Sequence, residues 1–316
     1  GQNKNIYEAE IDAVCELVDF LRFNVSYADS IMRKQPIQTG SIKNISEYNS
    51  LNGFVASITP FNFTAIGGNL ASAPLLFGNS VLWKPSDNAI LSNHLFYNIM
   101  LEAGLPRGVL NFCPMEPKIF LDKVSEQKDL GAVLFTGSST VFDEIYHKVA
   151  SSITSRNTYP RIIGETGGKN FHFMDSSCGD MVDHVVEKTV ESAFNYSGQK
   201  CSACSIIYIP ENLFSQTIGK LQVWTDHFNN NIENYGLINK KSYDRVNTIL
   251  DELRSDDNVE FLVDGGDCEY ENYLVQPQIL VCNDHNHRVF NEEFFAPILA
   301  IYPYKEEEKE EVMDMC

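Results

Sequence analysis

The feature that most constrains the fold is an alternation of short apolar runs with amphipathic segments between residues 53 and 163. The apolar runs have the length of buried strands: 53–58, 80–84, 109–113, 132–135 and 161–163. The segments between them have helical spacing: 65–77, 88–103, 117–126 and 140–152. Strands that alternate with helices form βαβ units and a parallel sheet. We therefore expect an α/β fold that gathers the carboxyl ends of its strands, where such sheets bind ligands, along one edge.

The length and the change of rhythm along the chain predict two domains. A chain of 316 residues suggests two domains at about 150 residues each. Residues 7–33 have the apolar spacing of one long amphipathic helix, and the regular alternation stops after Gly164. Beyond that point the pattern predicts two helices and three strands: helices 180–194 and 242–254, strands 205–209, 259–263 and 298–304. We place the boundary near Gly164, which gives domains of residues 1–164 and 165–316. The charge run 305–311 predicts the start of a solvated helix.

Charge and composition exclude several function classes. The chain has 24 Lys and Arg against 43 Asp and Glu, a net charge of −19 at pH 7. This balance argues against nucleic-acid partners, which need clustered cations, and against docking on anionic membranes. The richest apolar stretch, residues 65–77, is too short for a membrane span and contains Gly67, Gly68 and Pro74. Eight irregularly spaced cysteines do not form a disulfide framework, so we expect thiols in a reducing compartment.

The two ends suggest a chain cut from a longer one. The first residue is Gly rather than Met, no signal or transit peptide is visible, and a charged stretch precedes the last four residues. We therefore expect further sequence on both sides. A central sheet without its flanking elements would expose edge strands that are prone to aggregation.

The segment Gly198–Cys204 contains one local chemical signal. A cysteine after a glycine-containing turn, as Cys201 is, can be an exposed nucleophile because nearby N–H dipoles stabilise a thiolate. Three other interpretations stay open on this motif alone. Cys201 can be a core residue, or it can form a redox pair with Cys204. The Cys-x-x-Cys spacing can also be half of a zinc site, although no second such pair exists and 285–287 is more typical of a solvated loop.

Two polar side chains follow the ends of predicted strands, Glu165 closely and Asn62 in the turn after its strand. Glu165 precedes the glycine pair Gly167–Gly168, so it can face a cleft and act as a general base for water. A turn with a capping Glu is an equally good interpretation. Asn62, in the segment Ile58–Thr64, can donate its amide hydrogens to an oxyanion, although a turn into the next helix is the more common role of Asn.

Two further strand ends are candidates for nucleotide contacts. Gly137 and Ser138 lie between a strand and a helix, where backbone N–H groups favour a phosphate. Lys84 and Ser86 follow another strand and can hold ribose hydroxyls; a helix cap with a surface Lys is the alternative. The sequence has no G-x-G-x-x-G motif, so the usual dinucleotide fingerprint is absent.

Taken together and in this order, these segments resemble the aldehyde dehydrogenase superfamily from about residue 8 to the end. Five of them are similar to the branch whose members oxidise L-glutamate 5-semialdehyde: 60–69, 81–87, 102–106, 167–173 and 198–204. The resemblance implies a Rossmann-type parallel-sheet cofactor domain, residues 1–164, and a second α/β catalytic domain, residues 165–316, both truncated.

The resemblance also implies roles for individual residues. Cys201 matches the nucleophile, Glu165 the general base for deacylation and Asn62 the oxyanion-hole amide. Six residues match contacts to the cofactor: Lys84, Ser86, Gly137, Ser138, Glu293 and Phe295. Ser202 matches a contact to the substrate carboxylate in this branch. Ala296 stands where the family usually has Gly, which slightly crowds the backbone near the cofactor.

The activity implied by the resemblance is NAD-dependent oxidation of L-glutamate 5-semialdehyde, formed from 1-pyrroline-5-carboxylate, to L-glutamate. It proceeds through a cysteine thiohemiacetal and thioester, as part of proline degradation, and needs NAD but no metal. For the full-length protein the resemblance implies a homo-oligomer in the mitochondrial matrix. The alternatives are an aldehyde dehydrogenase for another semialdehyde or an aliphatic aldehyde, and a non-catalytic fragment of the fold.

Overall fold

The computed structural model of the chain describes residues 2–231, 236–266 and 270–316. The chain divides into two compact units, which are described separately below. The first contains residues 6–166 and the second residues 167–316, which is joined by the short N-terminal stretch Asn3–Asn5.

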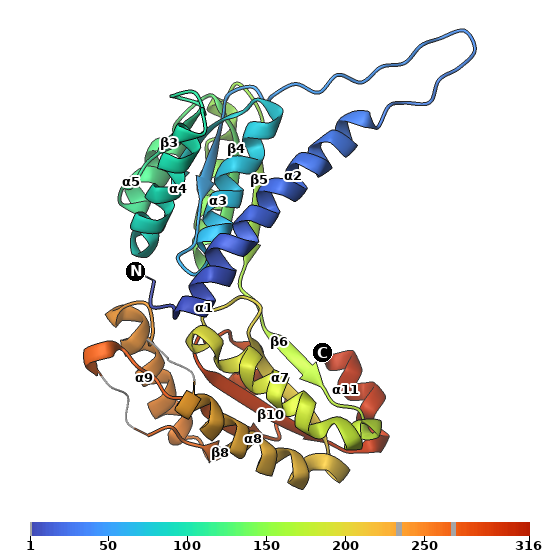
Figure 1. The fold of residues 1–316 in the computed structure, drawn as a ribbon, viewed down its shortest axis with the longest axis vertical. Coiled ribbons are helices and arrows are strands. Elements are labelled where there is room, and N and C mark those ends of the chain that lie inside the picture. The colour runs from blue at the N-terminus through green and yellow to red at the C-terminus, as the bar shows by residue number, and fades with distance from the viewer. Residues whose placement is uncertain (1, 232–235, 267–269) are drawn as a thin grey trace. The chain divides into compact units, whose positions relative to one another are not determined.

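The first unit is built on a parallel sheet, part of which is labelled in Figure 1. The sheet has five strands in the order β3-β2-β1-β4-β5. The strands are β1 (Phe54–Ile58), β2 (Ser80–Lys84), β3 (Leu110–Phe112), β4 (Leu130–Gly137) and β5 (Arg161–Thr166). The predicted α/β fold with a parallel sheet is therefore confirmed. The strand order changes direction between β1 and β4, and sheets of this type bind ligands at the carboxyl ends of the strands beside such a switch point.

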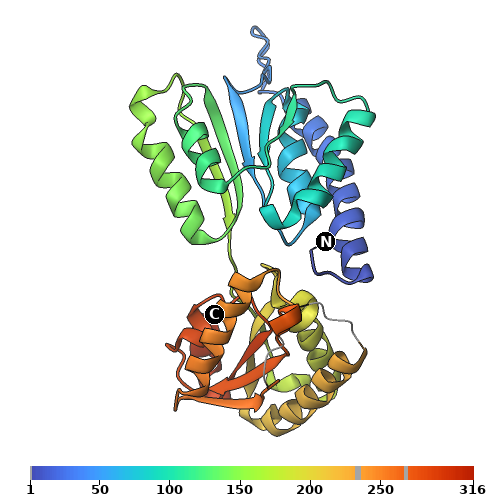
Figure 2. The ribbon, with the colours of Figure 1, turned by 90° about the vertical axis from the view of Figure 1, so that its left-hand side faces the viewer.

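Helices cover both faces of this sheet (Figure 2). They are α1 (Ile6–Ala9), α2 (Glu16–Arg33), α3 (Thr64–Ser72), α4 (Ile90–Glu102), α5 (Pro117–Ser125) and α6 (Ser139–Ser151). One core cluster packs α2, α3 and α4 against the sheet, and another packs α5 and α6 against it. Val55 and Ala56, neighbours in β1, belong to different clusters because successive side chains of a strand point to opposite faces.

Two predicted helices differ in detail from the structure. The helix predicted over 65–77 is α-helical only as far as Ser72 and continues as a 3₁₀ segment, Ala73–Phe77. Pro74 explains the change, because its ring removes a donor and clashes with the carbonyl one turn earlier. The helix predicted over 7–33 is continuous but contains a π-helical segment, Glu10–Cys15.

The second unit is built on a mixed five-stranded sheet with the order β6-β7-β10-β9-β8. The strands are β6 (Asn170–Phe173), β7 (Cys204–Pro210), β8 (Val259–Val263), β9 (Gln278–Cys282) and β10 (Ile298–Tyr304). β8 runs antiparallel to β9, and the other neighbours run parallel. The sequence pattern predicted β7, β8 and β10 but not β6 or β9.

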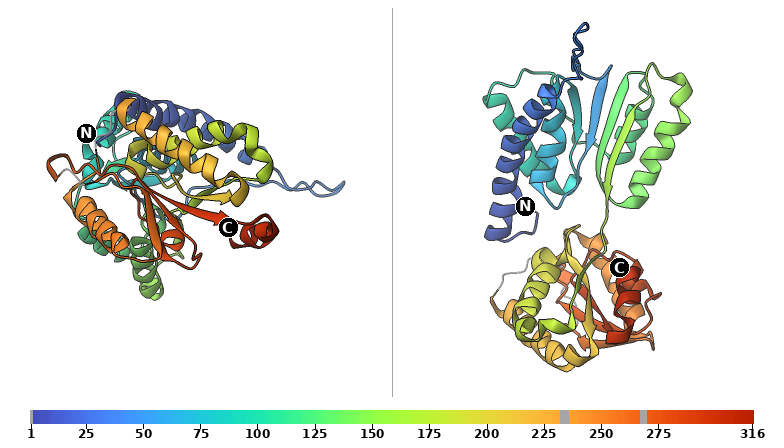
Figure 3. Two further views of the ribbon diagram at one scale, coloured as in Figure 1. Left: turned by 90° about the horizontal axis from the view of Figure 1, so that it is seen from below. Right: turned by 90° about the vertical axis from the view of Figure 1, so that its right-hand side faces the viewer.

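Helices also cover both faces of the second sheet (Figure 3). They are α7 (Val182–Phe194), α8 (Glu211–Asn231), α9 (Lys240–Arg254), α10 (Arg288–Asn291) and α11 (Lys309–Met315). α7 and α8 share one core cluster, whereas α9, α10 and α11 share the other. Within the described part of the chain, every helix is too short or too polar to cross a lipid bilayer.

Candidate active site

The parallel sheet of the first unit brings six of the predicted site residues to its carboxyl edge. Ile58 at the end of β1 is in register with Lys84 at the end of β2 and with Phe135 of β4, and Thr136 is in register with Glu165. The six residues lie at or just beyond these strand ends: Asn62, Lys84, Ser86, Gly137, Ser138 and Glu165. This edge, beside the switch point between β1 and β4, is where the fold class binds its ligands.

Lys84 is a buried cation on this edge. Its side chain is only 4% exposed, and its Nζ lies 3.0 Å from Oδ1 of Asp87, which is largely exposed. The alternative of a surface Lys is therefore wrong. Ser86 does cap the short 3₁₀ segment that begins at Asp87, because its Oγ accepts the N–H of Asn88 at 3.4 Å. Burying an ammonium is costly unless it is paired. The ion pair with Asp87 offsets part of this cost and fixes the position of the Lys84 ammonium.

Gly137 and Ser138 lead from β4 into the N-terminus of α6. Ser138 caps the helix, since its Oγ accepts the N–H of Val141 at 3.4 Å. A Cβ at Gly137 would lie 2.6 Å from the ring of Phe135, so only glycine fits without rearrangement. The first turn of a 13-residue helix leaves N–H groups that can bind an anion, and a phosphate is the anion that such a loop usually holds.

Asn62 and Glu165 have different surroundings on the same edge. Asn62 is 4% exposed and lies in the loop between β1 and α3. A buried amide in a fixed loop can offer its N–H groups in one direction, as an oxyanion donor must. Glu165 is exposed on β5, where a carboxylate stays accessible to water.

In the second unit, a strained turn precedes Cys201. Tyr196, Ser197 and Gly198 all have positive φ angles, 55°, 53° and 67°. A Cβ at Gly198 would lie 2.3 Å from the carbonyl oxygen of Ala296, so this position requires glycine. Non-glycine residues with positive φ persist only where the surrounding structure imposes them, and they concentrate at functional sites.

The turn that carries Cys201 is held by the segment Gly167–Asn170. The Nδ2 atom of Asn170 donates to the carbonyl oxygen of Cys201 at 2.6 Å and to that of Ala203 at 3.1 Å. A Cβ at Gly168 would lie 2.2 Å from the carbonyl oxygen of Cys201, so the two backbones touch. Cys201 is half-buried and Ser202 is exposed. Cys201 therefore sits on a fixed backbone and is only partly buried.

Cys204 is buried, whereas Cys201 is only half-buried. Cys204 is 2% exposed, and its thiol lies 3.2 Å from the carbonyl oxygen of Ile206. Burial raises the pKa of the Cys204 thiol to about 12, with hydrogen bonds to the backbone partly opposing the shift. A thiol of this kind is inert, so a redox pair with Cys201 is disfavoured.

His285 and His287 do not support a zinc site, because both side chains have other partners. His285 lies 3.0 Å from the hydroxyl of Tyr208, and His287 caps α10 and pairs with Asp256 at 2.9 Å. Across residues 2–231, 236–266 and 270–316, no group of three or more His, Cys, Asp or Glu side chains is arranged to hold a metal ion.

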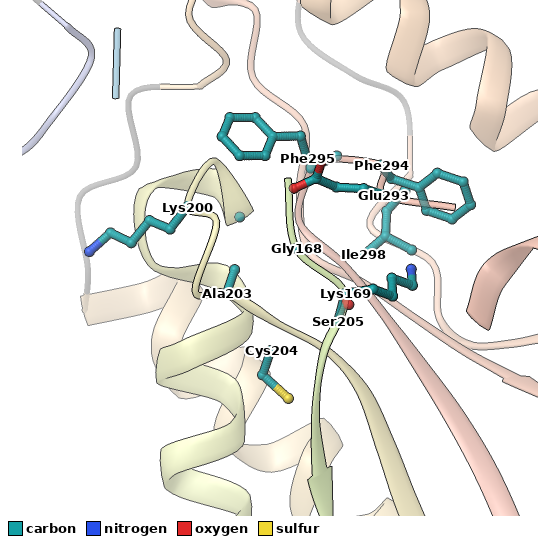
Figure 4. A pocket seen from close by; sticks show the side chains of 12 residues that line it. Gly168, Lys169, Lys200, Ala203, Cys204, Ser205, Glu293, Phe294, Phe295 and Ile298 are labelled. Carbon is teal, nitrogen blue, oxygen red and sulfur yellow. The ribbon is translucent and has the colours of Figure 1, made fainter. Parts of the chain in front are cut away.

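Glu293 and Phe295 line a small pocket beside this turn (Figure 4). The carboxylate of Glu293 accepts a hydrogen bond from the backbone of Gly168, and a Cβ at Gly167 would lie 2.7 Å from its Oε2 atom. Burial raises the pKa of the Glu293 carboxyl; the Gly168 hydrogen bond and the charges of Lys169 and Arg245 oppose the shift. The double glycine thus makes room for this carboxylate.

Lys169 belongs to the same pocket. Burial lowers the pKa of its ammonium to about 8, against the opposing attraction of Glu293 and Glu292. Its Nζ lies 4.9 Å from the centre of the Phe294 ring, a cation–π contact.

The second unit therefore carries four of the predicted residues on two loops, Cys201 and Ser202 before β7 and Glu293 and Phe295 before β10, and the segment Gly167–Gly168 touches both loops. Sequence reasoning gave no role to Asn170, Lys169 or Gln199. Gln199 is buried, and its Oε1 accepts the N–H of Ile238 at 2.9 Å. Asn170 had one usable signal, its place directly after the Gly-Gly-Lys run at a turn.

Relatives of known sequence cover the entire chain. The profile of the Aldehyde dehydrogenase family matches residues 1–316. Delta-1-pyrroline-5-carboxylate dehydrogenase, mitochondrial, of Rattus norvegicus is 43% identical over all of this chain and 57% of its own length. The protein of the same name from Homo sapiens is 42% identical, again over all of this chain and 57% of its own length. The chain thus spans somewhat more than half the length of these curated relatives.

Solved structures of a dehydrogenase with a similar name also match nearly the whole chain. The crystal structure of the Delta-pyrroline-5-carboxylate dehydrogenase from Mycobacterium tuberculosis matches with a TM-score of 0.91 and 35% identity, over 99% of this chain and 58% of that one. A structure of the same enzyme bound with NAD matches with a TM-score of 0.90 over the same shares. With the family profile matched from end to end, the chain belongs to the aldehyde dehydrogenase family.

Proposed function

We propose that the full-length protein oxidises L-glutamate 5-semialdehyde, formed from 1-pyrroline-5-carboxylate, to L-glutamate with NAD as the oxidant, in proline degradation. The observation that carries this proposal is the Cys201 turn, a half-buried thiol on a strained backbone clamped by Asn170 and Gly168. It is supported by the names of relatives that are 42–43% identical over the whole chain.

The residues present fit a dinucleotide. Buried Lys84 and the capped N-terminus of α6 offer donors suited to ribose and phosphate oxygens, and Glu293 offers an acceptor for ribose hydroxyls. The solved relative bound with NAD supports the same cofactor. When bound, NAD supplies the hydride acceptor of the reaction. We assign Ser86, Gly137 and Ser138 to the adenosine and pyrophosphate side and Phe295 to the nicotinamide side. Residues 1–164 would then supply the cofactor domain and residues 165–316 the catalytic domain.

The chemistry proposed for the chain's own residues has three parts. The Cys201 thiolate attacks the aldehyde carbon, which forms a C–S bond and places a negative charge on the carbonyl oxygen. The Asn62 amide donates to that oxygen; removal of one donor of this kind costs about 3–4 kcal/mol of transition-state stabilisation.

After oxidation the carbon is held as a thioester. Glu165 takes a proton from water, which attacks the thioester and releases L-glutamate and the thiolate. We assign Ser202 to the substrate carboxylate.

Location and assembly belong to the same proposal. The curated names of the rat and human relatives include the word mitochondrial, which supports the mitochondrial matrix as the location. We propose a homo-oligomer for the full-length protein, to be tested by its mass in solution.

The test uses the full-length protein and one substitution. Cys201→Ser should abolish NADH formation from glutamate semialdehyde while NAD still binds, because serine lacks a thiolate but keeps the shape of the turn. The matched control is Cys15→Ser, an exposed cysteine of the first unit, which should keep full activity. Turnover by Cys201→Ser would refute the assignment. Rates with succinic semialdehyde and propanal, measured beside glutamate semialdehyde, identify the preferred substrate.

A further inference from the structure

Phe294 anchors the segment 293–295 in the core. This segment contains two of the proposed cofactor contacts, Glu293 and Phe295. The Phe294 side chain is 4% exposed and belongs to the core cluster of α9, α10 and α11. Its neighbours Glu293 and Phe295 are only half-buried and line the pocket. Phe295 has a φ of 51°, an unfavourable angle for a phenylalanine, which persists only when neighbouring contacts impose it. The placement of both side chains therefore depends on how firmly Phe294 is held.

Two cations hold the ring of Phe294. The Nζ atom of Lys169 lies 4.9 Å from the ring centre, and Cζ of Arg288 lies 5.7 Å from it. Arg288 is engaged elsewhere, since it also pairs with Glu252 and with Glu292 at 2.8 Å. No carboxylate in the described residues lies within ion-pair distance of Lys169, so the ring is its specific close contact. A cation–π contact strengthens when the cation is desolvated.

We propose that Lys169 is a positioning residue of the cofactor site: its ammonium holds the Phe294 ring, and thereby sets Glu293 and Phe295 for the nicotinamide end of NAD. The inference rests on the proposed function, because it takes from it the roles of Glu293 and Phe295. Figure 4 shows the Lys169 side chain and the Glu293–Phe295 segment bordering the same pocket.

The charge of Lys169 adds a second effect on the same segment. Glu292 and Glu293 are adjacent acidic residues, and their charges act on Lys169 from the loop before β10. Arg245, on α9, is the other cation whose charge acts on Glu293. Loss of the Lys169 charge leaves the Glu293 carboxylate, which burial already disfavours, with less compensation. Both effects weaken binding of the ribose next to the nicotinamide.

The test compares Lys169→Met, which keeps the length of the side chain and removes its charge, with Lys169→Arg, which keeps the charge and stacks on aromatic rings. In the full-length protein, Lys169→Met should raise the Kd for NAD about tenfold, the effect of one desolvated cation–π contact. Lys169→Arg should restore binding to within about threefold of the original value. Kd is measured by calorimetry without substrate, so the readout does not depend on turnover.

Further variants distinguish a positioning role of Lys169 from a nonspecific effect of removing a lysine. Phe294→Leu should weaken NAD binding by a similar factor, and the double variant Lys169→Met/Phe294→Leu should be no weaker than the worse single one, because both remove the same contact. Lys188→Met is the matched control. Lys188 is an exposed lysine of α7 whose Nζ lies 2.8 Å from Glu191, and its loss should change Kd less than about twofold.

Separate measurement of KM for NAD and of kcat gives an independent readout. Lys169→Met should raise KM for NAD while kcat at saturating NAD stays within about threefold, since the residue acts on binding. A melting temperature shows that each variant is folded, and Lys169→Gln takes the place of Lys169→Met if the latter does not fold. An unchanged Kd in folded Lys169→Met or Lys169→Gln overturns this inference and leaves the proposed function standing. A wild-type protein that binds no NAD overturns both.

Discussion

At the scale of single residues, Cys201 and Cys204 show how environment separates two identical side chains. They are three positions apart, yet one sits half-buried on a strained turn and the other is packed at the start of β7 with its pKa raised to about 12. The sequence motif alone left nucleophile, redox pair, zinc site and core residue open. Burial and hydrogen bonding, which a spacing pattern does not contain, favour the nucleophile.

Asn170 offers a direct test of how the Cys201 turn is held. Asn170→Ala removes the donor to the carbonyl oxygens of Cys201 and Ala203, so the turn gains freedom. We expect kcat/KM for the aldehyde to fall about tenfold or more, since small misplacements of a reacting group are costly. The Kd for NAD should change less than about twofold, because Asn170 holds the turn and not the cofactor.

The control for this prediction is Asn157→Ala in the first unit. Asn157 donates to Asp129 at 2.7 Å on the exposed surface, so the variant loses a comparable side-chain hydrogen bond far in the chain from the turn. Its kcat/KM should be unchanged. Equal loss of kcat/KM in both variants, or none in Asn170→Ala, would contradict the positioning role.

At the scale of elements, the regular part of the chain was predictable and the irregular part was not. Residues 53–163 follow one rule, strand then helix, so the strands of the first sheet lie within a few residues of their predicted positions. β6 is a four-residue strand beginning at Asn170, directly after the Gly-Gly-Lys run, where polarity and glycine indicate a turn. α8 was not predicted, because its exposed side is strongly polar and hides the apolar spacing. The helix is stabilised by packing against α7 and the sheet.

The candidate site was predictable as a set of residues but not as a geometry. Resemblance to the family assigned Glu293 its role, whereas the glycine pair that makes room for it lies more than a hundred positions away in the chain. The contacts of Lys169 with Phe294 and of Asn170 with Cys201 join the starts of different strands of one sheet and the loops before them. Such contacts arise from tertiary packing, which local periodicity does not encode.

The packing of α4 against α3 yields a stability prediction. Asn93 is fully buried in α4, neither its Nδ2 nor its Oδ1 has a hydrogen-bond partner, and a Cβ at Gly67 would lie 2.5 Å from its Oδ1. Asn93→Ala should raise the free energy of unfolding by about 1 kcal/mol, because relief of an unpaired buried amide and better helix propensity outweigh a small cavity.

Chemical denaturation of the two proteins measures this difference, and Asn98→Ala separates its causes. Asn98 is a partly exposed residue on the same helix, so its replacement gains helix propensity and loses only a long, exposed contact, 3.5 Å between its Nδ2 and Nδ1 of His94. Stabilisation by Asn93→Ala that does not exceed that of Asn98→Ala would show that the buried amide carries no penalty.

At the scale of the whole molecule, the candidate residues are divided between two compact units. The first contains the proposed general base, oxyanion donor and phosphate site, and the second contains the nucleophile, Glu293 and Phe295. Each unit has its own sheet and its own two core clusters. Neither unit contains a complete set of catalytic groups, so the proposed activity requires both.

In the proposed reaction, the sulfur of Cys201 becomes covalently acylated and Glu165 is needed to release the product. Full-length Glu165→Gln protein, mixed with NAD and glutamate semialdehyde, should therefore accumulate the acyl group, since the amide no longer activates water. Peptide mass spectrometry after rapid acid quenching measures where the added mass lies. We expect the glutamyl mass on the peptide that contains Cys201, together with a burst of NADH, if the proposed reaction is correct. A burst of NADH with the mass on another cysteine, or with no added mass on any peptide, would contradict it.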